Sequence, residues 1–332
     1  MAATNVTLPT WADLAKRTDA GWTKSLPLIN LVNRRHGLYG ALRWEEANMG
    51  LSHRTSVATG LPTSAYMMFN QGLEASDGSY ANATFPVAKI GTLAEVHAEL
   101  IKVAVDKEGF LSGKIMLHVE SLLRKLSSEM WYGTAATAEG IVGLSALYSS
   151  TTADKGQNAL DAGGGDASDN ASMWLLNIGP NMKGLYPRGT PAGIEREAVG
   201  YETSESLGGT GLKGRVYREF LHIGAGVAPE DWRDGVRVAN IDVSAILAET
   251  NDADLIKFGR KAKARMATRP VYDRKWFMHP TIWEAIESQR DDRQIAGGGI
   301  SKATIDGIEV PTFHGYEVVV DDNMVLTEAP IA

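Results

Sequence analysis

The distribution of apolar residues predicts an α+β fold. Residues 42–89 and 173–242 have the character of strands and turns, and within them Val236 and Val238 alternate with Arg237 and Ala239, as in a strand that exposes one face. Residues 111–131 instead repeat apolar residues at spacings of three and four, which is typical of an amphipathic helix. The chain also contains 35 glycines among 332 residues, so we expect many turns and close approaches of the backbone.

The N-terminal segment predicts only short elements. Residues 10–13, T-W-A-D, have the spacing of a capping box and predict a helix that ends near Thr18. The apolar run at residues 27–32 predicts a second short, buried piece.

Residues 41–101 predict an extension rich in strands. Residues 42–47 and 52–59 flank a turn at 48–50 and are expected to pair as a hairpin. Residues 66–70 and 80–89 continue the strand pattern.

Residues 91–105 fit two patterns. Alternation favours a strand, whereas the spacing of Leu93, Val96 and Leu100 also fits a helix that begins after Thr92. The pattern alone leaves both open.

The helix at residues 111–131 has the clearest pattern. At about 1.5 Å per residue it would be roughly 30 Å long. Gly133 is expected to end it. Its predicted apolar stripe consists of Ile115, Val119, Leu122, Leu126 and Met130.

The second half of the chain predicts strands, then helices, then strands. Residues 149–172 are polar and glycine-rich, which indicates a loop. Residues 231–242, D-W-R-D-G-V-R-V-A-N-I-D, predict a half-buried strand entered through a tight turn at Gly235. Residues 243–266 and 280–289 predict helices, and residues 297–299, G-G-G, predict a loop between elements. Strands are expected over residues 303–328, broken at Pro311.

Composition excludes several classes of function. The length fits one large domain or two, and 44% hydrophobic residues suffice for a core. With no cysteine, disulfides and zinc–thiolate sites are impossible. A net charge of −7 argues against a dedicated nucleic-acid binder. We expect no membrane span, because no uncharged apolar run approaches about 18 residues, and no secretory signal at residues 1–7.

One literal nucleotide-binding motif occurs, at residues 209–214, G-T-G-L-K-G. A dinucleotide site needs a buried strand before this motif and a helix after it. Here polar residues precede the motif and a strand pattern follows it, so a loop is the favoured interpretation.

No catalytic, cofactor-binding or metal-binding residues are predicted. None of the histidines pair at the spacings that place two ligands on one face. The acidic pairs Glu45–Glu46 and Asp321–Asp322 do not converge, because neighbouring residues on a strand face opposite ways. The histidines are His36, His53, His97, His118, His222, His279 and His314.

The segment at residues 231–242 resembles one in the major capsid proteins of tailed double-stranded DNA bacteriophages, whose fold is shared with herpesvirus shells and encapsulins. Further short blocks resemble the same family in the same order. They are residues 8–15 (L-P-T-W-A-D-L-A), 52–63 (S-H-R-T-S-V-A-T-G-L-P-T), 70–72 (N-Q-G) and 174–193 (W-L-L-N-I-G-P-N-M-K-G-L-Y-P-R-G-T-P-A-G).

This resemblance implies four structural parts. They are an N-terminal arm (1–40), an extended β-hairpin loop (41–101), a peripheral domain with a long spine helix (102–150 and 255–332) and an axial domain (151–254). It also favours a strand over residues 91–105. In the family the hairpin loop lies over a neighbouring subunit, and the axial domains meet at the centre of a capsomer.

The function implied is self-assembly, through hexamers and pentamers, into an icosahedral capsid that encloses phage DNA. No enzyme activity, cofactor or membrane partner is expected. Implied partners are a scaffolding protein, a portal, a cement protein and, weakly and non-specifically, the packaged DNA. The protein would be in the host cytoplasm during assembly and then in the virion. As residues at subunit contacts we predict Arg43, Glu45, Glu46, Arg54, Trp232 and Arg233.

Two alternatives remain open. An encapsulin-like shell with protein cargo would share the architecture. A nucleotide-dependent enzyme would depend on residues 209–214 alone. Some capsids of the family link a lysine of the hairpin loop to a neighbour's asparagine. No lysine occurs between Lys24 and Lys89, so we expect non-covalent shells.

Overall fold

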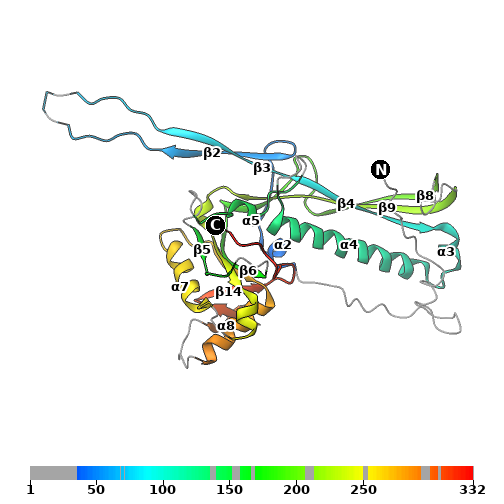
Figure 1. Ribbon diagram of the computed structural model, residues 1–332. Coiled ribbons are helices and arrows are strands. Elements are labelled where there is room, and N and C mark those ends of the chain that lie inside the picture. Colours follow the sequence, from blue (N-terminus) through cyan, green and yellow to red (C-terminus); the bar gives the residue numbers. More distant parts are fainter. Residues whose placement is uncertain are drawn as a thin grey trace.

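A computed structural model describes residues 36–67, 69–70, 72–134, 140–151, 158–165, 169–205, 213–249, 253–292, 300–305 and 308–331. Figure 1 shows a two-stranded ribbon that projects from a body made of two sheets and a long helix. The predicted α+β class is confirmed. The predicted helix at 10–18, the piece at 27–32 and the loop at 297–299 lie outside the described residues.

The elements follow one another along the chain as a strand-rich first part, a long helix, and alternating strands and short helices. The helices are α2 (Gly37–Ala41), α3 (Ala98–Val103), α4 (Lys107–Tyr132), α5 (Leu144–Leu147), α6 (Val243–Leu247), α7 (Leu255–Arg265) and α8 (Pro280–Asp292), with a 3₁₀ turn η3 (Trp232–Asp234). The strands are β1 (Trp44–Glu46), β2 (Ser52–Gly60), β3 (Ser79–Pro86), β4 (Ala88–His97), β5 (Ala159–Asp161), β6 (Asn170–Ile178), β7 (Met182–Tyr186), β8 (Ile194–Ser204), β9 (Gly214–Pro229), β10 (Gly235–Asp242), β11 (Asp273–Met278), β12 (Ile300–Ile305), β13 (Ile308–Phe313) and β14 (Tyr316–Val320).

The ribbon consists of β2 and β3, which pair antiparallel from Ser52 opposite Pro86 to Gly60 opposite Ser79. Beyond this pair, residues 61–67 and 72–78 have no regular structure, so the strand predicted over residues 66–70 is wrong for those that are described.

The predicted pairing of residues 42–47 with 52–59 is also wrong. β1 instead pairs in parallel with β7, with Trp44 opposite Gly184. The indole explains this partner, because a Cβ atom on Gly184 would lie 2.9 Å from the Trp44 ring. Only glycine allows that close approach.

The long strand β9 organises the first sheet. It pairs antiparallel with β4 on one edge and with β8 and β7 on the other. Helix α4 packs across β4 and β9. It begins at Lys107, four residues before the predicted start, and is capped by Asp106. It ends at Gly133 as predicted, where a Cβ atom would lie 2.3 Å from the carbonyl oxygen of Ile141.

The ambiguous residues 91–105 contain both predicted structures. The strand is correct up to His97, and the residues after it form helix α3. The imidazole of His97 accepts a hydrogen bond from the amide of Glu99, so this side chain caps the helix. Leu100 and Ile101 of α3 pack with Val96 and Phe110 in a small buried cluster.

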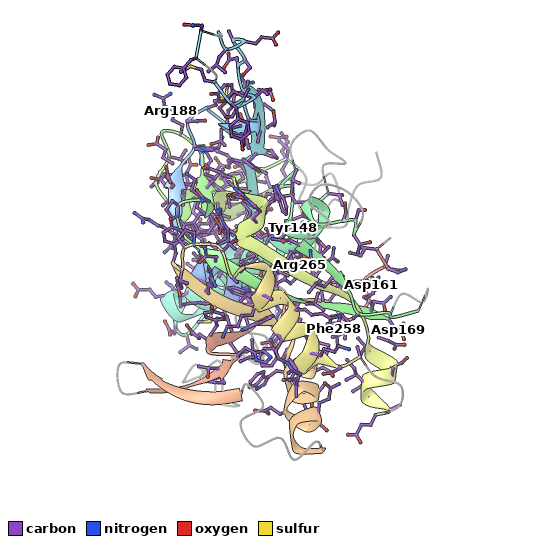
Figure 2. All side chains as sticks on the ribbon, turned by 90° about the vertical axis from the view of Figure 1, so that its left-hand side faces the viewer. Tyr148, Asp161, Asp169, Arg188, Phe258 and Arg265 are labelled. Carbon is purple, nitrogen blue, oxygen red and sulfur yellow. The ribbon has the colours of Figure 1, made fainter. Side chains whose placement is uncertain are left out.

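The second sheet has seven strands in the order β12-β13-β14-β11-β6-β10-β5. It joins strands from distant parts of the chain, since β6 pairs with β10 on one side and β11 on the other. In Figure 2 the ribbon points towards the viewer, and α7, marked by Phe258 and Arg265, lies in front of this sheet. Helices α6, α7 and α8 bury their apolar sides in one core with the sheet.

Strand β10 corrects two predictions from the sequence. All its residues except Asp242 are buried, so it is not a half-buried strand. Gly235 has an extended backbone rather than a turn, and a Cβ atom there would lie 2.6 Å from the Tyr148 hydroxyl. The glycine therefore provides close packing. Pro311 does not break β13, because it lies beyond the two residues of that strand that pair with β14.

Candidate assembly interface

Four charged or titratable side chains join the root of the ribbon to the body. Nε2 of His53, on β2, lies 3.0 Å from Oε1 of Glu230. Nζ of Lys183 lies 3.0 Å from the same oxygen and 2.9 Å from Oε2 of Glu45. The backbone amide of Asn48 donates to the other ring nitrogen of His53. Strands β1, β2 and β7 and the end of β9 are thus held together at one point, which fixes the direction of the ribbon.

This root cluster carries charge although Lys183 and His53 are buried. Burial by itself lowers the pKa of Lys183, but hydrogen bonds to Glu45 and Glu230 outweigh that effect and raise it. The hydrogen bond from Lys183 also lowers the pKa of Glu45. Both groups are therefore ionised at neutral pH.

A groove of about 520 Å³ lies beside the root. One wall is formed by residues 55–58 of β2, and the other by Asn181 and residues 230–233. Strand β2 pairs only with β3 among the described strands, so its second edge is open. An open strand edge beside a polar groove is a surface that an extended segment can join.

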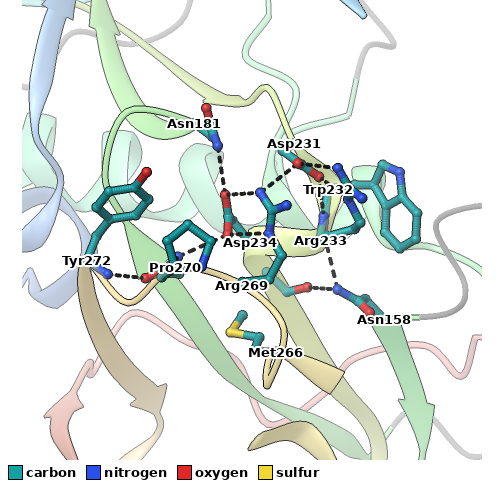
Figure 3. Close-up of polar contacts among 12 residues, drawn as sticks. Asn158, Asn181, Asp231, Trp232, Arg233, Asp234, Met266, Arg269, Pro270 and Tyr272 are labelled. Carbon is teal, nitrogen blue, oxygen red and sulfur yellow. Dashed lines mark hydrogen bonds and ion pairs between the residues drawn. The ribbon is translucent and has the colours of Figure 1, made fainter. Parts of the chain in front are cut away.

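The far wall of the groove is a rigid turn, drawn in Figure 3. Asp231 caps η3 by accepting from the amide of Arg233, and its two carboxylate oxygens lie 2.9 and 2.8 Å from the guanidinium of Arg233. The fully buried Asp234 accepts from Arg269 at 3.1 and 3.2 Å. The amides of Asn177 and Asn181 also donate to Asp234, at 3.0 and 3.1 Å.

The charges of this turn stabilise one another. Burial alone would raise the pKa of Asp231, but Arg233 and then Arg269 lower it below its ordinary range. The pKa values of Arg233 and Arg269 are raised, chiefly by hydrogen bonds to Asp231 and Asp234 respectively. The turn therefore holds Trp232 and Arg233 at the groove in a fixed geometry.

The structure gathers the predicted contact residues around the ribbon root. Glu45 binds Lys183, and Glu46 accepts from the amide of Gly189. Trp232 is half-buried and lines the groove together with the exposed Arg233. Arg43, directly before β1, and Arg54, on β2, are both exposed. Contact of these residues with a neighbour stays a prediction.

Sequence reasoning missed His53, Lys183 and Glu230, which position the ribbon. Their partners lie up to 177 residues apart, and no local pattern marks such contacts. Within the described residues no group of three or more side chains could hold a metal ion, and no helix is long and apolar enough to cross a bilayer. Gly209 and Gly211 lie outside that part, and Gly214 begins β9, so a strand follows the motif.

The outer part of the ribbon exposes large apolar side chains. Tyr66 and Phe69 are fully exposed, and Leu61 is 91% exposed. Met67 and Leu73 are exposed as well. Single exposed apolar residues are ordinary, but five on one thin loop form a surface that a partner would cover. We call residues 61–78 the ribbon tip.

Comparisons with known proteins find the same architecture in phage capsids. The family model for major capsid protein GP7 matches residues 23–332. Among solved structures, the capsid protein of bacteriophage Epsilon15 is similar, with a TM-score of 0.75 and 21% identity over 100% of this chain and 99% of that one. The capsid protein of bacteriophage JBD30 has a TM-score of 0.50 and 8% identity over 89% of this chain and 92% of that one.

No curated protein sequence matches the chain. The two capsid structures show that the fold is shared, and the family match favours a phage capsid over an encapsulin-like shell. Because the family model spans nearly the whole chain, the protein belongs to the major capsid protein GP7 family.

Proposed function

We propose that the chain builds its shell through the ribbon, whose tip lies on a neighbouring copy of the same chain. As a member of its family the protein is a structural subunit that assembles with itself into the icosahedral capsid of a tailed phage. The ribbon is the proposed means of that assembly.

The exposure of the ribbon tip carries this proposal. A two-stranded ribbon is marginally stable in water, and the residues of the ribbon tip that the structure describes add no further strand. Their apolar side chains gain stability only when another surface removes them from water. A second copy of the chain is always present in a shell, so it is the natural partner.

We also propose a division of the chain that follows its sheets. The axial domain would contain the seven-stranded sheet with α6, α7 and α8, and the peripheral domain would contain α3, α4, β4, β8 and β9. This moves residues 255–320 to the axial part, and residues 88–101 and 194–229 to the peripheral part, away from the boundaries expected from sequence. The sheet pairings between β6 and β11 and between β4 and β9 support the change.

The remaining proposals concern partners and place. A scaffolding protein, a portal and a cement protein would accompany the chain, which would assemble in the host cytoplasm before it lies in the virion. Contact with packaged DNA would be weak and non-specific, because the chain carries a net charge of −7. We propose no enzymatic role.

Excision of the ribbon tip tests the proposal. Gly60 and Ser79 face each other at the end of the ribbon, so residues 61–78 can be replaced by Asn-Gly, which favours a two-residue hairpin turn. The root cluster and the groove remain intact in this variant. We expect a folded subunit with an unchanged melting temperature that forms no closed particles in sedimentation velocity.

A second variant keeps the loop and replaces only its apolar side chains. The variant Tyr66→Ser, Met67→Ser, Phe69→Ser keeps the loop length and should also fail to close shells. Normal particles from the excision variant would show that the ribbon tip is dispensable and would overturn the proposal.

A further inference from the structure

Helix α7 carries a strongly basic face. Between Leu255 and Tyr272 there is no Asp or Glu, although the whole chain has a net charge of −7. The apolar side of the helix packs on the sheet, and Gly259 lies so close that a Cβ atom would be 2.4 Å from the Phe313 ring. The opposite side exposes Lys257, Arg260, Lys261 and Arg265.

Those residues lie on one face of the helix, because Lys257 is three positions from Arg260 and four from Lys261, and Lys261 is four positions from Arg265. Figure 2 shows α7 at the front of the helical layer, on the side towards which the ribbon projects. We call Lys257, Arg260, Lys261 and Arg265 the basic stripe.

An acidic groove lies in the same helical layer, between α6 and α8. It has a volume of about 180 Å³ and is lined by Glu249 and Glu284, with the exposed Leu247 at its edge. Glu287 is exposed one turn further along α8. We call Glu249, Glu284 and Glu287 the acidic rim.

Within one copy the two surfaces do not neutralise each other. Among the described ion pairs, none joins Lys257, Arg260 or Lys261 to the acidic rim. Ser288 donates to Glu249 at 3.4 Å, and Lys261 lies over the Phe258 ring at 4.6 Å. These contacts leave the charges of Lys257, Arg260 and Lys261 on one surface, and those of the acidic rim on the other, available to another molecule.

We infer that the basic stripe of one copy docks against the acidic rim of the next copy around a ring. Rings of identical subunits close through heterologous contacts, in which two different patches of the same chain meet. A basic patch and an acidic patch on one helical layer meet that requirement. The inference rests on the self-assembly proposed above, but it concerns a surface separate from the ribbon.

Charge complementarity favours a second copy over a nucleic acid as the occupant. A polyanion would gain the basic stripe but would be repelled by the acidic rim and by the negative charge of the whole chain. A second copy satisfies both patches at once. Each exposed ion pair is weak and is screened by salt. The contact would act through its repetition around the ring and would set the register of neighbours.

Charge reversal tests the inference, because both patches belong to the same chain. The first variant is Lys257→Glu with Arg260→Glu, the second is Glu284→Lys with Glu287→Lys, and the third combines all four. The control is Lys257→Arg with Arg260→Lys, which keeps the charge. Assembly of purified protein, with coexpressed scaffolding protein if the unmodified chain requires it, is followed by light scattering against protein concentration.

We expect each variant with one reversed patch, which is a single reversal, to raise the protein concentration needed for half-maximal assembly by about tenfold or more at low salt. The combined variant should return to within about threefold of the unmodified chain, because the pairs reform with exchanged signs. Circular dichroism should show the same fold in all four variants.

Two results would overturn the inference. One is unchanged assembly in both single reversals. The other is a combined variant that remains as impaired as its two parents, which would show that the basic stripe and the acidic rim do not meet each other. If the unmodified chain does not assemble under any of these conditions, the proposed function itself fails.

Discussion

Arg237 and Glu328 form a buried ion pair that joins the centre of β10 to the C-terminal segment. Nη2 of Arg237 lies 2.7 Å from Oε2 of Glu328, and the two residues are 2% and 7% exposed. Glu328 also accepts from the hydroxyls of Tyr132 and Ser172. Further along, the backbone of Ile331 bonds to the side chain of Asn240. Glu328 and Ile331 of the C-terminal segment are thus both bound to side chains of β10.

Removal of Glu328 should destabilise the subunit severely. Glu328→Ala leaves the guanidinium of Arg237 buried without its counter-ion, which costs about 3–5 kcal/mol. Lys125→Ala breaks an exposed pair on α4 and should cost less than about 1 kcal/mol. The free energy of unfolding of unassembled subunits in urea measures both. Equal losses in the two variants would contradict the role of this pair.

At the groove turn, replacing a buried charged residue should cost far more stability than replacing an exposed one. Asp234→Ala removes the acceptor of Arg269, Asn177 and Asn181 and should cost about 3 kcal/mol or more. Arg233→Ala alters only an exposed pair with Asp231 and should cost less than about 1 kcal/mol. Thermal melting of the two variants is the measurement, and a larger loss in Arg233→Ala would refute this interpretation.

Two histidines should make the fold less stable in mild acid. Burial is the main cause that lowers the pKa of both His118 and His314 below the ordinary 6.5. A histidine with a depressed pKa is neutral in the fold but takes up a proton when unfolded, so its contribution is complete above about pH 6.5 and is lost as the pH falls below it.

Replacing these two side chains should flatten the pH dependence of stability. We expect the loss of unfolding free energy between pH 7 and pH 5 to shrink in the variant His118→Gln, His314→Asn. Asparagine suits position 314, where φ is +50°. Urea titrations at each pH provide the test. An unchanged slope would assign the acid sensitivity to other groups.

The mature shell should contain no covalent bonds between subunits. An isopeptide bond to asparagine needs an amine that can lose its proton, and the guanidinium of Arg54 on β2 cannot supply one. No lysine lies between Lys24 and Lys89, so the ribbon offers no nucleophile. Particles boiled in denaturing detergent should give one band near 35.7 kDa. A ladder of larger bands would contradict this and would point to Lys89 or Lys102.

Local periodicity accounts for the part of the fold that the sequence predicts. The spacing of Ile115 to Met130 is set within one helix, so α4 is recognised without its neighbours. Helices α7 and α8 and the strands from β6 to β10 follow for the same reason. The periodic pattern does not reveal that α4 starts at Lys107, because a single capping side chain, Asp106, decides where the helix begins.

Contacts between distant segments account for the rest. Arg237 has the appearance of a solvent-facing residue in an alternating strand, but Glu328, 91 residues away, makes its burial tolerable. Trp44 pairs with β7 and not in the expected hairpin, because Gly184 has no side chain and lets the indole approach the backbone. Charged residues at the ribbon root were predicted individually, whereas Lys183, which joins Glu45 to Glu230, could not be found without the fold.

Electron microscopy of the purified, unmodified chain tests the central claim most directly. The protein is expressed alone and with a scaffolding protein, and particles are examined across protein and salt concentrations. We predict closed icosahedral shells or capsomer rings, in which density for the ribbon tip, residues 61–78, lies against an adjacent subunit. A species that stays monomeric under every condition, or shells whose ribbons project freely into solvent, would contradict the account.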